Sequence, residues 1–191
     1  MDFAETSVVN PMTGTRIELL DLNAVGGRLR YESPPGAGVE YAKHVHLHWE
    51  ETFDMISGQG EYQLGRDRKV LGEGETVVLP AGVPHVHPTN HGSEPMVMEQ
   101  TIVAKGGSEA SIRATFGVLF SLFDWHGQGK LRRNRMGYPM NPLHFAAMGK
   151  VLGDAGSFDG MVPIAAQRFT GATLGRLAMA LGYDPIDPKW K

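Results

Sequence analysis

The stretch that decides the fold is His44-Val45-His46-Leu47-His48-Trp49-Glu50-Glu51. Successive side chains on an extended strand point to opposite faces, so the three histidines share one face while Val45 and Leu47 share the other. A buried imidazole needs a partner for each polar nitrogen, so strand stability alone does not explain three of them on one face. Imidazole nitrogens beside a carboxylate are ligands of zinc, iron, manganese, nickel and copper. The stretch therefore predicts a transition-metal site; the alternative is a solvated strand face with exposed histidines.

A second histidine pair follows in residues 74–87, Gly-Glu-Thr-Val-Val-Leu-Pro-Ala-Gly-Val-Pro-His-Val-His. Together the two stretches resemble the cupin superfamily. The first cupin motif is matched by Gly38, His44, His46, Glu51 and Gly58, and the second by Gly74, Pro80, Gly82 and His85. The last position of the second motif, Asn in the family, holds Thr89 here, with Asn90 one residue late. The motifs span less than a third of the chain. The resemblance implies that the metal ligands are His44, His46, Glu51 and His85.

The resemblance also implies a mainly β fold, a cupin jelly-roll (double-stranded β-helix) barrel. Short apolar runs separated by Gly and Pro corners, at a spacing of roughly 8–12 residues, independently indicate an antiparallel sandwich or small barrel. We expect this cupin β-barrel, with its N-terminal strands, to occupy residues 1–106, where residues 1–15 form a loosely held lead-in.

The remaining residues, 107–191, are predicted to form an α-helical extension that packs on the barrel. Apolar residues recur at helical spacing after Ser108, which is a plausible N-cap. Asn141 followed by proline predicts the start of a second helix, and residues 163–181 form a third. Between the first two helices, residues 130–135 (Lys-Leu-Arg-Arg-Asn-Arg) form a basic cluster. We interpret it as a solvated loop, with an anion site as the alternative, because no glycine-rich phosphate cradle accompanies it.

Composition limits the classes of partner. The formal net charge of −3 gives no general attraction for nucleic acid. The absence of cysteine excludes disulfides, thiolate ligands and a cysteine nucleophile. The acidic N-terminal residues contain no apolar stretch, and no uncharged apolar run of roughly 18 residues occurs, so we expect a cytoplasmic protein without stable membrane insertion. The resemblance and the need to cover sheet edges predict a homodimer.

The expected ligand set determines the chemistry that we consider. Four protein ligands leave one or two positions open on a five- or six-coordinate divalent transition-metal ion. Iron(II) there supports dioxygenase chemistry, whereas zinc, manganese or nickel polarises a substrate as a Lewis acid. We favour a non-haem iron dioxygenase that acts on a small organic substrate. The alternatives are a redox-neutral cyclase, isomerase or lyase, and a cupin that binds a metabolite without catalysis.

Two further histidines are predicted to act on the substrate. His48 and His87 continue the alternation of the strands that carry the ligands, so each is expected to face the cavity or its rim. An imidazole there can serve as a general base or as a hydrogen-bond partner of the substrate. The alternative is a partly exposed histidine at the barrel mouth.

Four residues are predicted to line the substrate pocket. Phe53 and Met55 share the alternation of Glu51 and should line an apolar cavity. Met98 and Gln100, on the last strong β run, are expected to add an apolar wall and a polar contact. For the methionine side chains, core packing is the alternative.

Overall fold

The computed structural model describes residues 6–38, 41–106 and 108–191. Residues 1–5, part of the predicted lead-in, lie outside the described residues. The strands are β1 (Ser7–Val9), β2 (Arg16–Asn23), β3 (Gly26–Ser33), β4 (His44–His46), β5 (Trp49–Ser57), β6 (Gln59–Leu64), β7 (Asp67–Gly72), β8 (Thr76–Leu79), β9 (His85–Thr89), β10 (Met96–Ala104) and β11 (Ser157–Asp159). The helices are α1 (Glu109–Gly127), α2 (Pro142–Asp154), α3 (Ile164–Thr170), the π-helical turn η1 (Gly171–Gly175), α4 (Arg176–Ala180) and the short 3-10 helix η2 (Pro188–Trp190).

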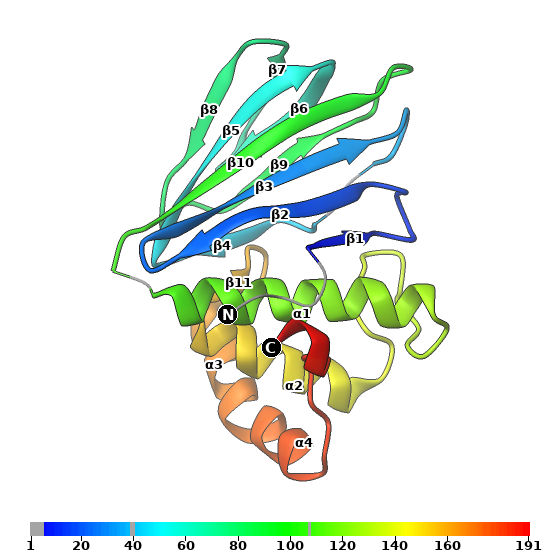
Figure 1. Ribbon diagram of the computed structural model, residues 1–191. Helices are drawn as coiled ribbons and strands as arrows, with labels where there is room; N and C mark the ends of the chain where they lie inside the picture. The colour runs from blue at the N-terminus through cyan, green and yellow to red at the C-terminus, as the bar shows by residue number, and fades with distance from the viewer. Residues whose placement is uncertain (1–5, 39–40, 107) are drawn as a thin grey trace.

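The strands form two antiparallel sheets, with the helices gathered on one side of them (Figure 1). The first sheet has the order β1-β2-β3-β10-β5-β8, and the second has the order β11-β4-β9-β6-β7. Strands far apart in the chain are neighbours, as where β10 lies between β3 and β5, and such crossovers are typical of a jelly roll. The predicted mainly β fold with C-terminal helices is confirmed.

Strict alternation along β5 determines which of its side chains reach the interior. Trp49, Glu51, Phe53 and Met55 are buried, while the residues between them are partly exposed. Because apolar side chains gain from leaving water, the aromatic and methionine residues hold this register and carry Glu51 inward with them. A carboxylate placed among these apolar residues must find partners in the interior.

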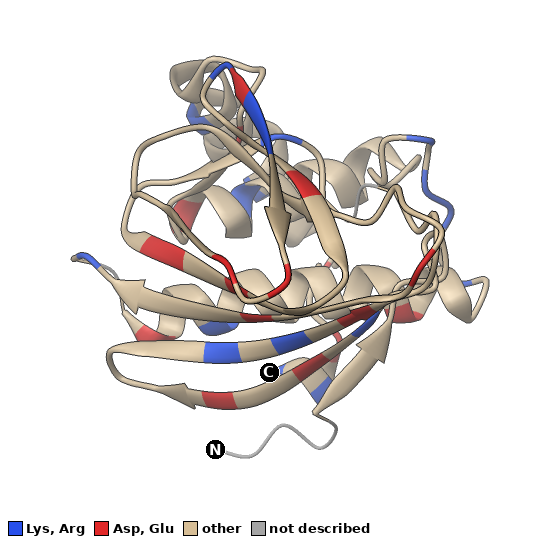
Figure 2. Cartoon of the chain, turned by 90° about the horizontal axis from the view of Figure 1, so that it is seen from above, with Lys and Arg blue, Asp and Glu red and all other residues tan. Residues whose placement is uncertain are grey.

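The outer face of the six-stranded sheet carries paired charges. Figure 2 shows acidic and basic residues side by side on neighbouring strands. Arg28 and Arg30 of β3 lie 2.7 Å and 3.2 Å from the carboxylate of Glu99 on β10. Exposed ion pairs of this kind contribute little to stability, so the fold rests on its interior.

The helices share the main apolar core with the sheets. Core residues of the sheets, such as Leu29 and Met98, belong to the same buried cluster as Phe116 and Phe120 of α1 and Trp190 of η2. A smaller cluster of Val118, Leu122, Leu131 and Met148 joins α1 to α2. The helical region therefore buries much of its apolar surface against the same interior as the strands.

The predicted helix starts are observed. Ser108 caps α1 by accepting from the N–H of Ser111, and Asn141 caps α2 by accepting from Leu143 and His144. The predicted third helix is present as the run α3–η1–α4, which a π-helical turn interrupts. No described helix combines the length and hydropathy needed to cross a membrane.

Two short strands were not expected from the sequence. β1 lies within the predicted loose lead-in and pairs with β2. β11 follows α2 through Gly156, whose φ of 83° is a left-handed conformation that favours glycine. β11 then pairs antiparallel with β4, so that Ser157 lies opposite His46. A residue that follows a helix thereby becomes the neighbour of the first histidine pair.

Candidate metal centre

Five side chains converge in the interior: His44 and His46 from β4, Glu51 from β5, and His85 and His87 from β9. Their nitrogen and carboxylate oxygen atoms all lie within 4.8 Å of one another. Four of the five residues are buried, and His44 is partly buried. The structure thus brings together the four residues expected as ligands and adds His87 to them.

Strand pairing explains this convergence. β4 and β9 are hydrogen-bonded neighbours, with His44 directly opposite His85. Glu51 lies on the other sheet, on the strand that pairs with β10 and β8. The two sheets therefore present imidazoles from one side and a carboxylate from the other, an arrangement that local alternation alone could not create.

Backbone carbonyls hold two of the imidazoles with their lone pairs toward the centre. The Nδ1–H of His44 donates to the carbonyl of Ala42, and that of His85 donates to Val83, both at 2.8 Å. A carbonyl oxygen only accepts, so the proton of each neutral ring must lie on Nδ1. The Nε2 atom of each ring then carries a lone pair, and metal-bound histidines are commonly anchored in this way.

His46 is held by a chain of hydroxyl groups that reaches α1. The single hydroxyl proton of Thr115 is donated to the carbonyl of Ser111, so the hydroxyl of Ser157 must donate to Thr115, 3.2 Å away. Ser157 is then left to accept from the Nδ1–H of His46 at 3.0 Å. As for His44 and His85, the Nε2 atom of His46 is left with its lone pair.

These lone pairs face a carboxylate. The Nε2 atom of His85 lies 2.8 Å from Glu51 Oε2, yet it has no hydrogen-bond partner among the described residues. The Nε2 atom of His46 lies 3.6 Å from the other carboxylate oxygen. The Nε2 atom of His44 accepts a hydrogen bond from Nε2 of His87 at 3.1 Å. Lone pairs held this close in a buried site repel one another unless a cation lies between them. The donor set therefore fits a transition-metal ion, for which nitrogen and oxygen ligands are suitable.

Burial sets the protonation states that such an ion requires. Burial, reinforced by the neighbouring imidazoles, holds the pKa of His44 well below its usual value of 6.5. Burial also lowers the pKa of His87, and it lowers that of His46 to about 3 against the attraction of Glu51. Burial alone would raise the pKa of Glu51, but His46 and His87 hold it well below its usual value. At neutral pH these three imidazoles are neutral and the carboxylate is ionised, which are the forms that bind metals.

The metal-free protein is expected to lose stability as the pH falls from 7 to 5. The pKa of His46 is about 3 in the folded chain and near 6.5 in the unfolded chain, so only the unfolded chain gains a proton in this window. Stability therefore falls with the pH, by about 2 kcal/mol at pH 5 for His46 alone. The lowered pKa values of His44 and His87 act in the same direction.

Urea denaturation at the two pH values, with chelator present, measures this loss. His46→Gln should reduce it, whereas His91→Gln, which replaces an exposed histidine, should leave it unchanged. Equal stability of the wild-type protein at pH 7 and pH 5 would contradict the assignment of neutral buried imidazoles.

Gln100 positions Glu51. Its Nε2 atom donates to Glu51 Oε1 at 2.6 Å, and its own Oε1 accepts from the hydroxyl of Tyr31 at 2.8 Å. Gln100 is fully buried and does not line the cavity beside the cluster. Gln100 was expected to offer a polar contact to substrate, and in the structure both ends of its amide are occupied by Tyr31 and Glu51.

The open space lies on the helical side of the cluster. A cavity of about 310 Å³ is bounded by His44, His46, Glu51 and His87 together with residues of the helices and β11. Its apolar wall includes Phe116, Leu119 and Phe123 of α1, Phe145 and Met148 of α2, and Phe158 of β11. The helices therefore shape the space that a ligand of this cluster would enter.

The other three predicted pocket residues lie elsewhere. Phe53, Met55 and Met98 are buried in the main core, and none of them lines the cavity. The ring of Phe53 packs on that of His87 at 4.6 Å between centroids, which supports the cluster from behind. The placement differs from the expected one because strand alternation indicates which face a side chain takes but not whether neighbours fill the space in front of it.

His48 is not part of the cluster. Residues 47 and 48 form a bend between β4 and β5, which breaks the alternation on which the prediction depended. The His48 ring lies against Gly156, so closely that a Cβ atom on that glycine would overlap it. Because His48 neither joins the cluster nor lines the cavity, we assign it no catalytic role.

Several residues of the site were missed in the sequence. Trp49 takes the inward position that His48 was expected to hold and stacks on His46, with centroids 4.3 Å apart. Its indole N–H is buried and has no hydrogen-bond partner among the described residues. The alternation that it shares with Glu51 could have revealed Trp49.

Tyr138 and Asp159 meet at the wall of the cavity and were not indicated by any sequence pattern. The hydroxyl of Tyr138 donates to the Asp159 carboxylate. Burial and this hydrogen bond raise the pKa of Tyr138, so the phenol remains protonated. The two residues are separated by α2, and only the folding of β11 onto β4 brings them together.

Residues 29–104 match the Cupin domain family. This chain contains a cupin domain. The matched segment runs from β3 to the end of β10 and includes all five residues of the cluster. The resemblance noted in the two motifs is thereby confirmed for residues 29–104.

Solved structures include similar cupin folds. A Klebsiella pneumoniae protein with a double-stranded β-helix domain is 26% identical, with a TM-score of 0.43, covering 52% of this chain and 84% of that one. A sugar phosphate isomerase of the cupin superfamily from Silicibacter pomeroyi is 19% identical, with a TM-score of 0.44, covering 52% and 69%. The Cnp3 cupin domain of Schizosaccharomyces pombe is 16% identical, with a TM-score of 0.44, covering 47% of this chain and 64% of that one. Scores this low carry no argument about activity. No curated protein sequence matches the chain significantly.

Proposed function

We propose that this protein is a metal-dependent enzyme that acts on a small organic molecule, with non-haem iron dioxygenase chemistry as the favoured class. One observation carries the proposal: imidazole lone pairs and an ionised carboxylate lie within 4.8 Å of one another at the wall of an open cavity. A closed structural site would not need such a cavity, and structural zinc sites usually employ cysteine, which this chain lacks.

His44, His46, Glu51 and His85 are the proposed ligands of one divalent transition-metal ion. Three of their rings are anchored at Nδ1, by Ala42, Ser157 and Val83, and each leaves Nε2 toward the centre. Anchoring of this kind orients a ligand and keeps it in the required tautomer. Iron(II) held there supplies the redox chemistry that dioxygen needs in order to react with an organic substrate; zinc, manganese or nickel would supply a Lewis acid instead.

His87 differs from the other three histidines. Its Nδ1 atom is buried without a hydrogen-bond partner among the described residues, so its ring lacks their anchor. Its Nε2 atom lies 3.3 Å from Glu51 Oε2, and the ring also borders the cavity. We assign it the role of holding or moving a proton next to the substrate, which an imidazole of lowered pKa can do near neutral pH.

The cavity wall would position the substrate and exclude water. Aromatic and aliphatic side chains of α1 and α2 contribute to it, and such walls bind the apolar part of an organic molecule. Trp49 also borders the cavity and adds an aromatic ring to this wall.

Metal exchange and oxygen uptake test the proposal. The metal-free protein is loaded with iron(II) or with zinc(II) and screened against a panel of small organic acids and aromatic compounds in an oxygen electrode. We expect oxygen uptake that requires both iron(II) and one class of substrate. Substrate conversion that continues without oxygen, or with zinc(II), would contradict the dioxygenase proposal and favour a redox-neutral cyclase, isomerase or lyase. A compound that binds and is recovered unchanged with every metal would favour a binding protein.

A further inference from the structure

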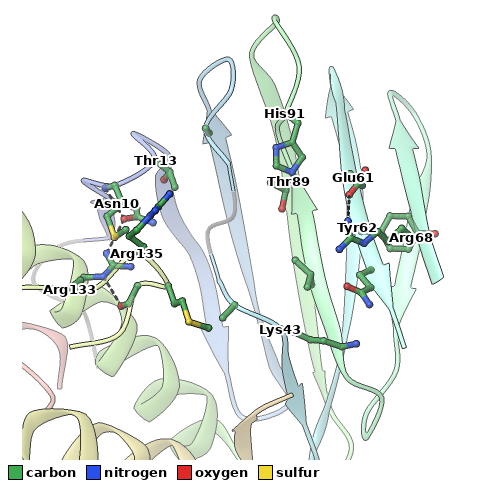
Figure 3. Close-up of a pocket in the computed structure, with 17 residues that line it drawn as sticks. Asn10, Thr13, Lys43, Glu61, Tyr62, Arg68, Thr89, His91, Arg133 and Arg135 are labelled. Carbon is green, nitrogen blue, oxygen red and sulfur yellow. Dashed lines mark hydrogen bonds and ion pairs between the residues drawn. The ribbon is translucent and has the colours of Figure 1, made fainter. Parts of the chain in front are cut away.

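A second and larger hollow lies beside the metal cavity. It has a volume of about 600 Å³ and crosses β6, β7 and β9 to the segment between α1 and α2. Figure 3 shows Arg133 and Arg135 on one side of it and Lys43, Tyr62 and Arg68 on the other. We call this hollow the outer groove.

The outer groove and the metal cavity meet. Ala42, Lys43, Arg133, Met136 and Gly137 line both of them. Lys43 directly precedes His44, the first residue of β4. A molecule in the outer groove is therefore next to the entrance of the cavity that contains the cluster.

The charge of the outer groove is strongly positive. Its described lining contains Lys43, Arg68, Arg133 and Arg135, but only one carboxylate, that of Glu61. This carboxylate lies 3.7 Å from Arg68 and offsets its charge. In a protein with a formal net charge of −3, such a concentration of cations in one hollow is a local feature and not a consequence of composition.

Neutral groups hold two of these cations in place. Lys43 Nζ donates to the carbonyl of Gly65 at 2.5 Å, which leaves two ammonium protons. Arg133 donates to the carbonyl of Gly137 and to the side chain of Asn10, and it lies over the ring of Phe123. These contacts fix the segment between α1 and α2 against the turn before β2, and so make one wall of the groove rigid.

Arg135 is the cation that is most available to a ligand. It is exposed, lines the groove and makes no hydrogen bond or ion pair with another described residue. Neutral hydrogen-bonding side chains such as Thr13, Gln63 and Thr89 line the same hollow. A planar guanidinium pairs with carboxylate and phosphate through two parallel hydrogen bonds.

We propose that the outer groove binds the anionic group, carboxylate or phosphate, of the substrate and presents the apolar remainder to the metal cavity. Arg135 and Lys43 make the direct contacts. This inference rests on the proposed function, since it names the substrate class of the same site. It also assigns a role to the basic segment 130–135, for which the sequence favoured a solvated loop.

Anion binding to the metal-free chain of 191 residues tests the inference without requiring turnover. Inorganic phosphate and succinate are titrated separately at low ionic strength and followed by NMR and calorimetry. We expect saturable shifts of resonances from groove residues such as Thr89 and His91. The anion that binds with the higher affinity indicates whether the acidic group of the substrate is a phosphate or a carboxylate. Arg135→Gln should weaken binding about tenfold, because a hydrogen-bonded charge is lost.

Arg132→Gln is the matched control, since Arg132 is an exposed arginine of the same segment that does not line the groove. It should change the affinity by no more than about twofold, as expected of a surface charge. Equal weakening by both variants, or no saturable binding of either anion, would overturn the inference. Metal binding is measured in parallel by titration with zinc(II). Anion binding without metal binding would refute the proposed function. Metal binding without anion binding would refute only the proposal that the outer groove binds the anionic group of the substrate.

Discussion

Glu51→Gln is expected to lower the affinity for zinc(II) or iron(II) at least about 100-fold, because the only carboxylate of the cluster is replaced by a neutral amide. The same change should not destabilise the metal-free protein. The new amide oxygen can accept from Gln100, as the carboxylate does. The new amide NH2 can donate to Nε2 of His85, which has no hydrogen-bond partner in the described part of the chain. The substitution thus replaces a buried charge by a satisfied hydrogen bond.

Thermal unfolding with and without metal measures both effects. Added zinc(II) should raise the melting temperature of the wild-type protein, because an ion that binds only the folded state stabilises it. It should not raise that of Glu51→Gln, whose metal-free melting temperature should equal or exceed the wild-type value. Glu18→Gln, a change on the sheet away from the cluster, serves as the control. A wild-type metal affinity in Glu51→Gln would show that the Glu51 carboxylate is not a metal ligand.

Trp190→Ala is expected to lower the free energy of unfolding by about 3–5 kcal/mol, the usual cost of deleting a large buried aromatic side chain. Trp190 is 1% exposed and packs edge-on against Phe120 of α1, with centroids 5.0 Å apart. Its indole N–H donates to Asp124 of the same helix at 2.9 Å. The C-terminal segment therefore holds α1 against the interior that it shares with the strands.

Urea denaturation of the metal-loaded protein measures the loss. Trp190→Phe should lose less stability than Trp190→Ala, because an aromatic ring still fills part of the site against Phe120, although the hydrogen bond and part of the buried volume are lost. Leu181→Ala, at an exposed position, should change stability by less than about 0.5 kcal/mol. A loss below about 1 kcal/mol in Trp190→Ala would show that the C-terminal segment contributes little to holding α1.

Much of the scaffold and the centre of the site could be predicted from the sequence. Alternation placed His44 and His46 on one face, and the two motifs added Glu51 and His85. The caps Ser108 and Asn141 located the starts of α1 and α2. Each of these inferences depends on interactions within a few residues of the chain, so a local pattern is enough to reveal them. Where the local pattern was broken, as at the bend that contains His48, the inference failed.

The surroundings of the centre depend on contacts between distant parts of the chain. Ser157 and His46 are hydrogen-bonded although they are 111 positions apart, and Gln100 reaches Glu51 across 49 positions. No local periodicity records such a pairing. The sequence by itself therefore determined most of the strands, the helix starts and four of the five residues that form the cluster. Only the tertiary structure decided which nitrogen of each histidine ring faces inward, where the cavity opens and which cations border its entrance. These three features depend on how the two sheets and the helices pack together in space.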